Sequence, residues 1–275
     1  MDCFRKIYRS LPLGAALWLV ILAAGCSGDR TPAAVLLNQA VDDARKGNWQ
    51  EAFQLAQNVL KREAAHPEAL VIHAIAAEKL GRIDLALNSA RKAAELHPEH
   101  FAAQYTLGRM LCDRPGGAAE AMQPLERALK ARPGDPNTLL LLGRAASRIN
   151  ADKTIDYYQM LPAEIRNRPE VQNQIAVYYL ARRGADRNNL ARAQQALAKA
   201  YNGAPRNPQI VHNLALYLDY CIPDKGKTVD QYQKAIGFYD RYLKLTVHNP
   251  ELNPERAQVQ ARKSKLEAKL RELKR

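Results

Sequence analysis

The sequence lacks the short motifs that mark the common classes of enzyme. It contains no H-E-x-x-H metal motif, no G-x-S-x-G nucleophile elbow, no Walker phosphate loop and no dinucleotide-binding glycine pattern. His97 and His100 lie close together beside Pro98, but no further ligand is near them in the sequence. Zinc sites need about three or four ligands held in a fixed geometry. We therefore expect no catalysis, no metal and no cofactor.

Acidic residues are also scarce relative to basic ones. The chain has 28 Asp and Glu against 41 Lys and Arg, a net charge of +13 over 275 residues. A basic excess of this size indicates nucleic-acid binding when the Lys and Arg residues cluster on one face of the protein. Here the basic residues are spread through the chain and no RNA- or DNA-binding motif accompanies them. We therefore expect no nucleic-acid partner.

Long hydrophobic runs are missing, apart from a short one near the N-terminus. Arg5, Lys6 and Arg9 precede residues 11–25, which carry no charge. This run is shorter than the roughly 20 apolar residues that a membrane-spanning helix needs. A basic N-terminal region, a short apolar core and small residues at a cleavage site are typical of a secretory signal peptide. We therefore predict a signal peptide over residues 1–25.

The end of this segment, Leu22-Ala23-Ala24-Gly25-Cys26, resembles the lipobox of bacterial lipoproteins. The family's most usual residue three places before the cysteine is Leu, whereas this chain has Ala23. The resemblance implies cleavage between Gly25 and Cys26, acylation of Cys26 with fatty acids such as palmitate, and a lipidated tether over residues 26–33. By resemblance to enterobacterial lipoproteins, the presence of Ser27 where Asp would favour inner-membrane retention implies export to the outer membrane, with the body facing the periplasm. The alternative is a plain signal peptide or an uncleaved anchor in which Cys26 is incidental.

The rest of the chain repeats a unit that is clearest at residues 67–100. Leu70, Ala74 and Ala77 recur at helical spacing, which predicts one helix face. A second such stripe is formed by Ala86, Ala90, Ala93 and Ala94. Stripes of small residues allow two helices to approach closely, so the unit is expected to be a pair of packed helices with a turn at Gly81.

A helix pair with a period of 34 residues resembles the tetratricopeptide repeat (TPR), whose pattern is W-x2-L-G-x2-Y, then A-x3-F, then P. The unit at 67–100 keeps Ala86 and Pro98 of that pattern, and Gly47-Asn48-Trp49 matches the family's turn. The array is expected to cover residues 34–250, with repeats at 34–66, 67–100, 101–135, 136–168, 169–207 and 208–250. A basic helix at 251–275, with Leu266, Leu270 and Leu273 on one side, is expected to cap it. The resemblance implies an all-α fold, a right-handed superhelix of about six helix pairs plus this cap.

Cysteine is too scarce and too dispersed to predict a disulfide. The chain has four, of which Cys3 would leave with the signal peptide and Cys26 would carry lipid. The remaining two, Cys112 and Cys221, fall on first helices three repeats apart. A disulfide needs Cα atoms within about 7 Å, so these two are not expected to bridge.

In the TPR family the first helix of each pair lines a concave groove that binds peptide segments. The residues that this placement points into the groove include Tyr105, Arg109, Arg144, Arg148, Asn173 and His212. Arginine binds carboxylates through two hydrogen bonds, so the expected protein partner is an acidic segment or a C-terminal segment. We expect no small-molecule substrate. The alternative is that these residues form solvent-exposed helix faces that bind no partner. The Asn and Lys arrangement of chaperone-binding members is not present.

Tyrosine offers another possible binding surface, because ten of the twelve tyrosines follow residue 150. Tyr179, Tyr239 and Tyr242 fall at positions that the repeat assigns to core packing. Tyr is also common at interfaces, so a tyrosine-lined patch in the C-terminal half stays open as an alternative.

The architecture resembles that of TPR lipoproteins that assemble type IV and Tad-type pili, including pilotins. It implies a membrane-anchored scaffold, not an enzyme, that binds a protein partner and holds or assembles it at the outer membrane. Two alternatives are a subunit of the outer-membrane protein assembly machinery and an accessory factor of a cell-wall enzyme. The regular repeats of this chain depart from the looser repeats of the barrel-assembly family.

Overall fold

The computed structural model describes residues 31–149, 151–186, 188–220 and 228–274. The predicted signal peptide, the lipidation site Cys26 and Cys221 lie outside these residues. The described part of the chain contains helices and no strand, which confirms the all-α prediction. The described residues fold as two compact units that are divided between Ser89 and Ala90, so that the boundary lies inside a helix.

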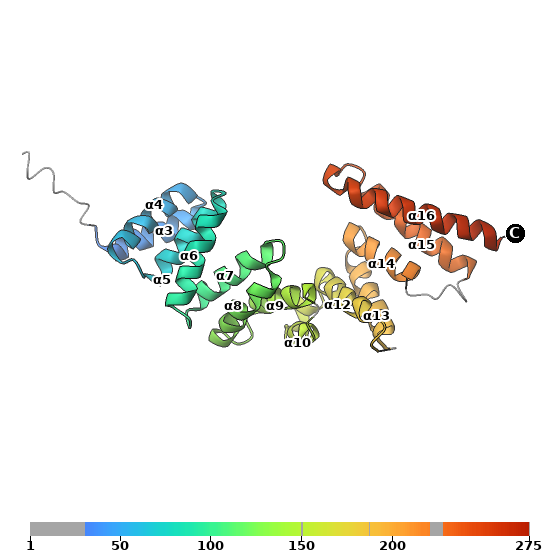
Figure 1. Ribbon diagram of the computed structural model, residues 1–275, viewed down its shortest axis with the longest axis horizontal. Helices are drawn as coiled ribbons and strands as arrows, with labels where there is room; N and C mark the ends of the chain where they lie inside the picture. The colour runs from blue at the N-terminus through green and yellow to red at the C-terminus, as the bar shows by residue number, and fades with distance from the viewer. Residues whose placement is uncertain (1–30, 150, 187, 221–227, 275) are drawn as a thin grey trace, which may run out of the picture. The chain divides into compact units, whose positions relative to one another are not determined.

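The helices follow one another in pairs, coloured in chain order in Figure 1. In the first unit are α3 (Ala33–Lys46), α4 (Trp49–Arg62), α5 (Pro67–Lys79) and the start of α6 (Ile83–Leu96). The second unit continues with α7 (Phe101–Asp113), α8 (Ala118–Ala131), α9 (Pro136–Arg148), α10 (Thr154–Gln159), the short α11 (Ala163–Arg166), α12 (Pro169–Ala181), α13 (Asn188–Gly203), α14 (Pro208–Tyr220) and α15 (Val229–Leu245). A 3-10 turn, η1 (Pro250–Leu252), leads into the final helix α16 (Asn253–Leu273). In the part of the chain described here, every helix is too short or too polar to span a bilayer.

Most first helices begin at a side chain that caps their N-terminus. Asp135 accepts a hydrogen bond from the backbone N–H of Thr138 at 2.8 Å, which caps α9. His66 and His100 act in the same way on α5 and α7, through Nδ1, at 3.5 and 3.4 Å. Capping satisfies N–H groups that have no partner inside the helix. His100, one of the two histidines considered above as metal ligands, is therefore a helix cap. The ring centroids of His97 and His100 lie 6.5 Å apart.

The two helices of a pair pack closely because small residues separate them. A Cβ added to Gly108 would lie 2.5 Å from Cγ of Leu125 in the partner helix, and one added to Gly143 would lie 2.5 Å from Cε1 of Tyr158. Only glycine fits at such distances. The predicted alanine stripes are buried as well: Ala74, Ala77, Ala90 and Ala93 are fully inaccessible, and Ala86 is 1% exposed.

His73 occupies a place where the repeat pattern normally has leucine. Its side chain is buried, its ring stacks on Phe53 with centroids 4.4 Å apart, and its Nδ1 lies 2.9 Å from Oγ of Ser89. Burial lowers the pKa of His73, and the nearby Arg82 lowers it further. His73 is therefore a neutral core residue that fills the leucine position.

The C-terminal helix α16 closes the second unit by packing on α15. Val259 and Leu266, seven residues apart, are buried in a cluster with Tyr239 and Tyr242, and Leu270 packs against the same cluster. Leu273, predicted to share this face, is 54% exposed instead, since it lies in the last turn of α16, past the cluster. The burial of Tyr239 and Tyr242 supports the packing interpretation of these tyrosines over a binding patch.

Candidate functional site

The predicted groove residues lie on α7, α9, α12 and α14, the first helices of four successive pairs in the second unit. Helix α7 contacts α9, α9 contacts α12, and α12 contacts α14. Side chains from neighbouring first helices can therefore meet, although about 30 residues separate them in sequence. We refer to α7, α9 and α12 together as the first-helix row.

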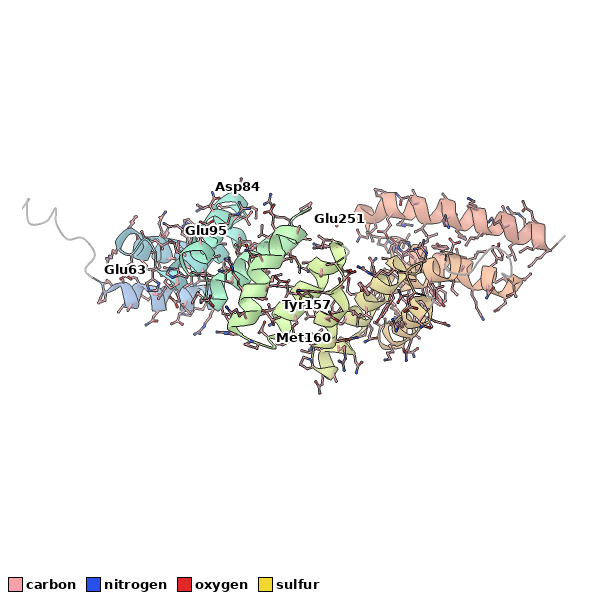
Figure 2. The ribbon with its side chains drawn as sticks, turned by 60° about the horizontal axis from the view of Figure 1, so that its bottom comes forward. Glu63, Asp84, Glu95, Tyr157, Met160 and Glu251 are labelled. Atoms are coloured by element: carbon pink, nitrogen blue, oxygen red, sulfur yellow. The ribbon has the colours of Figure 1, made fainter. Side chains whose placement is uncertain are left out.

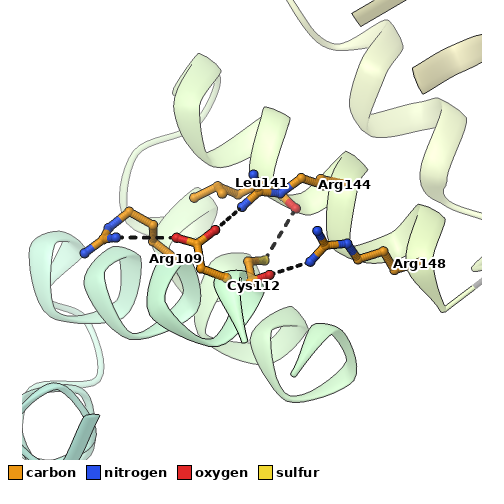
Figure 3. Close-up of polar contacts among 6 residues, drawn as sticks. Arg109, Cys112, Leu141, Arg144 and Arg148 are labelled. Atoms are coloured by element: carbon orange, nitrogen blue, oxygen red, sulfur yellow. Dashed lines mark hydrogen bonds and ion pairs between the residues drawn. The ribbon is translucent and has the colours of Figure 1, made fainter. Parts of the chain in front are cut away.

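Two of the predicted groove arginines, Arg109 and Arg144, pair with an acidic residue that was not among the predicted site residues. Asp113, at the end of α7, accepts a hydrogen bond at 2.7 Å from Nη2 of Arg144 on α9. Nη1 of Arg109 lies 3.5 Å from the other carboxylate oxygen of Asp113. Figure 3 shows the two guanidinium groups converging on this carboxylate. The arginines that were expected to grip a partner's carboxylate thus hold one supplied by the protein itself.

The third arginine of the predicted groove also bridges the same two helices. Arg148 donates a hydrogen bond from Nη1 to the backbone carbonyl of Cys112 (Figure 3). Cys112 itself is fully buried, and its thiol is 3.9 Å from the carbonyl oxygen of Leu141. Burial raises the pKa of this thiol, which favours its protonated form. Reversing the charge of these arginines would disturb the contact between α7 and α9 as well as any partner.

Tyr105 lies one turn before Arg109 on α7 and is half-buried. Its ring stacks on that of Phe101, with centroids 5.6 Å apart and planes 16° from parallel. Arg132 covers Phe101, with the guanidinium carbon 4.0 Å from the ring centroid. Burial raises the pKa of Tyr105, so its hydroxyl stays neutral. Phe101 and Tyr105 thus form an aromatic stack along α7 that Arg132 covers at one end.

Asn173 was expected on the open groove, but the structure buries it between two first helices. Its side chain is 4% exposed, and its Oδ1 accepts a hydrogen bond at 2.8 Å from Nδ2 of Asn213 on α14. A buried amide needs a partner, and this amide pair supplies one. Asn173 is therefore a packing contact, not a residue exposed to a bound segment.

His212 was also expected on the open groove, but the capping helix covers it. Its Nδ1 lies 2.9 Å from Oε1 of Glu255 on α16, and its ring lies 4.8 Å from the ring of Tyr242, measured between centroids. Desolvation lowers the pKa of His212, and Glu255 opposes that effect. Helical spacing places His212 on the outer face of α14, but α16 folds back over that face.

A cavity lies between α9, α10 and α12, beside the arginine cluster. Its volume is about 360 Å³. It is lined by Leu140, Leu141, Arg144, Tyr158, Arg168, Glu170, Val171 and Gln174. Arg144 belongs to both features, because its guanidinium reaches Asp113 and also borders the cavity. The first-helix row thus combines an apolar wall, from Leu140, Leu141 and Val171, with donors at one side.

The described residues contain no group of three or more His, Cys, Asp or Glu side chains that could hold a metal ion. The donors of the site are guanidinium, phenol and amide groups, and they lie beside the carboxylates of Asp113 and Glu170.

The chain is similar to solved structures of TPR proteins. PilW, a widely conserved type IV pilus biogenesis factor, matches with a TM-score of 0.61 and 16% identity over 81% of this chain and 97% of PilW. PilF of Pseudomonas aeruginosa matches with a TM-score of 0.59 and 16% identity, over 82% and 97% of the two chains. YrrB, a TPR protein with an unusual peptide-binding site, has a TM-score of 0.53 and 17% identity over 70% and 93%.

No protein-family model matches the sequence, and no curated protein matches it either. The structural similarity and the succession of helix pairs together establish that the chain has the TPR fold. The predicted resemblance to TPR proteins, pilus biogenesis factors among them, is therefore confirmed at the level of the fold.

Proposed function

We propose that this chain is a TPR scaffold that is tethered to the outer membrane by lipid on Cys26 and holds a protein partner there for the assembly of a pilus or secretion machine. The observation that carries the binding part is the first-helix row, where an open cavity with an apolar wall adjoins fixed donor groups. Stacked helical repeats form extended surfaces that bind other proteins.

The likeness to PilW and PilF supports the pilus part of the proposal. The similarity covers about four fifths of this chain and nearly all of both pilus proteins. YrrB supports the peptide-binding part, because it is a TPR protein with a peptide-binding site. The lipobox-like segment ending at Cys26 supports the tether, and Ser27 supports the outer membrane as its destination.

Replacing Cys26 with Ser is expected to abolish membrane attachment. The thiol that receives the lipid is lost, so the variant should accumulate as a precursor or in the soluble fraction and should not incorporate a fatty-acid probe. The measurement is cell fractionation with metabolic labelling, and Cys112→Ser is the matched control because that thiol is buried in the fold. Normal labelling and membrane retention of Cys26→Ser would rule out the tether.

The partner is expected to co-purify with the wild-type chain from detergent-solubilised membranes, in amounts comparable to the chain itself. Components of a pilus or secretion machine would support the proposal. Recovery of barrel-assembly proteins or cell-wall enzymes would move the chain to one of the alternative pathways, and recovery of the chain alone would argue against a scaffold.

A further inference from the structure

The fourth helix pair differs from its neighbours, because its second helix is short. Helix α10 has 6 residues, whereas the second helices α8 and α13 on either side of it have 14 and 16. Met160, which directly follows α10, is 55% exposed and marks the end of this helix (Figure 2). A full-length second helix packs on the next first helix, as α8 does on α9. The short α10 therefore leaves part of α12 uncovered.

A cavity of about 310 Å³ lies in this space, between α10, α11, α12 and α13. The buried Ile175 and Ala196 and the half-buried Ile155 and Tyr179 give it an apolar lining. It is separate from the cavity beside Arg144, because no residue lines both. None of the predicted groove residues lines it either.

Two hydrogen bonds hold α11 at the edge of this second cavity. Arg166, which lines the cavity, donates from Nη1 to the backbone carbonyl of Gln159 at 2.8 Å and so ties α11 to α10. The backbone carbonyl of Arg166 accepts a hydrogen bond at 2.9 Å from Nε2 of Gln172 on α12. Arg166 is therefore fixed in the wall of the cavity by contacts on two sides.

Every charged residue of this lining is basic. Arg166, Arg192 and Lys199 contribute three positive charges, and neither Asp nor Glu lines the cavity. The charge of Arg192 is partly offset by Asp186, whose Oδ2 lies 3.4 Å from Nη1 of Arg192. Arg166 and Lys199 have no ion-pair partner among the described residues. The acidic residues of α10 and α11 are exposed and lie outside the lining. Two positive charges thus face the cavity without compensation.

A ligand can reach these groups from solvent. Arg192 and Lys199 lie seven residues apart on one face of α13, and both are exposed. Gln195 lies between them, and it is exposed and lines the cavity, as do Gln159 of α10 and Asn167 at the end of α11. A side-chain amide can both donate and accept a hydrogen bond, so these three residues are suited to binding hydroxyl groups.

We propose that this second cavity binds a polyol phosphate, with the phosphate oxygens on Arg166 and Lys199. A phosphate presents several oxygen atoms, so cations from different helices can bind it at once, and arginine matches its geometry with two hydrogen bonds. The amide side chains then bind the hydroxyl groups of the ligand, and the apolar lining packs against its carbon skeleton. This site is additional to the proposed function and does not depend on a protein partner. A polyol phosphate occurs as a free ester and as the head group of a phospholipid, and the experiment below separates the two sources.

The test is isothermal titration calorimetry of the full-length chain in a non-ionic detergent, with glycerol phosphate as the probe. Glycerol, inorganic phosphate and glycerate are the controls, because they lack the anion, the hydroxyl-bearing carbon chain and the phosphate group respectively. We expect glycerol phosphate to bind about tenfold more tightly than each control, since each control loses hydrogen bonds that the probe makes. Glycerophosphoglycerol, the deacylated head group of phosphatidylglycerol, is a second probe. If this diester binds more tightly than glycerol phosphate, the source is a lipid head group, and if it binds less tightly, the source is a free ester.

Lys199→Gln is expected to weaken binding of glycerol phosphate by about tenfold, because it removes a charge-assisted hydrogen bond to the phosphate. The melting temperature should not change, since Lys199 is exposed and has no ion-pair partner among the described residues. Lys130→Gln is the matched control: it removes the same charge from an exposed position on the second helix α8, outside the cavity, and should leave binding unchanged. Gln195→Ala should weaken binding of glycerol phosphate about fivefold and leave binding of inorganic phosphate unchanged, because the amide serves the hydroxyl groups.

Three results would overturn the site. Equal weakening by Lys199→Gln and Lys130→Gln would show that a basic protein attracts the anion without a specific cavity. Binding of inorganic phosphate or glycerate as tight as that of glycerol phosphate would show that the polyol phosphate is not what is recognised. Absence of binding heat with both phosphate-ester probes would show that the cavity takes no such ligand. None of these results bears on the proposed protein partner, which co-purification tests separately.

Discussion

Ala86→Glu is expected to unfold or nearly unfold the repeat array. Ala86 is 1% exposed and lies on the stripe of small residues of α6, where the side chain has no route to solvent. Burying a charge without a partner is among the few changes that destabilise a protein by about 4 kcal/mol or more. Helical content and thermal unfolding, followed by circular dichroism, measure the effect.

The neighbouring position supplies the control, because Leu85 on the same helix is 39% exposed. Leu85→Glu introduces the same side chain on the solvent side and should change the free energy of unfolding by no more than about 0.5 kcal/mol. Glu99→Gln, between α6 and α7, should be similarly silent. Equal melting temperatures for Ala86→Glu and Leu85→Glu would show that the assigned packing face of α6 is wrong.

Asp219→Ala is expected to loosen the capping helix α16. Asp219 on α14 is 5% exposed, and its Oδ2 accepts hydrogen bonds from the Tyr239 hydroxyl at 3.1 Å and from Nε of Arg262 at 2.5 Å. Removing one member of a buried charge pair leaves the other uncompensated, which costs about 3 to 5 kcal/mol. A third of the Arg262 side chain is exposed, so a loss of about 3 kcal/mol is expected here.

The control for Asp219 is a more exposed ion pair that also involves α16 but joins it to α15. Nζ of Lys263 lies 2.6 Å from Oδ1 of Asp240, whose side chain is 42% exposed. Asp240→Ala should cost at most about 1 kcal/mol. Urea unfolding measures both variants, and limited proteolysis reports whether α16 becomes susceptible. If Asp219→Ala proves no more damaging than Asp240→Ala, the buried contact does not hold the cap.

The fold could be predicted from the sequence because its signals are local and repeated. Helical stripes of alanine, the Leu-Gly pairs at Gly108 and Gly143, and proline at the first helical position recur at one period. Each of these features acts within one helix pair, so repetition reinforces the pattern. The caps at His66 and His100 were not predicted, since histidine is not among the preferred capping residues.

The site was predicted less well because its contacts join helices from different repeats. Arg109 and Arg144 were expected to be available to a partner, but Asp113 pairs with both, and that pairing depends on how α7 stacks on α9. Asn173 and His212 have polar side chains on first helices, yet neighbouring elements cover both. Helical spacing identifies a face but does not reveal what packs on it. For Tyr158 the available signal was Gly143, which leaves room for a large ring in the facing helix.

The most direct test of the account is site-specific photo-crosslinking in cells. Replacing Gln174, which lines the cavity on α12, with the photo-reactive amino acid p-benzoylphenylalanine should yield an adduct between this chain and its partner after illumination. Tyr105 is a second position on the first-helix row, and its aromatic ring makes the replacement conservative. The control is Lys130, an exposed residue on α8, a second helix. We predict adducts from Gln174 and Tyr105 and none from Lys130. Adducts from Lys130 alone, or from none of the three positions, would contradict binding along the first-helix row.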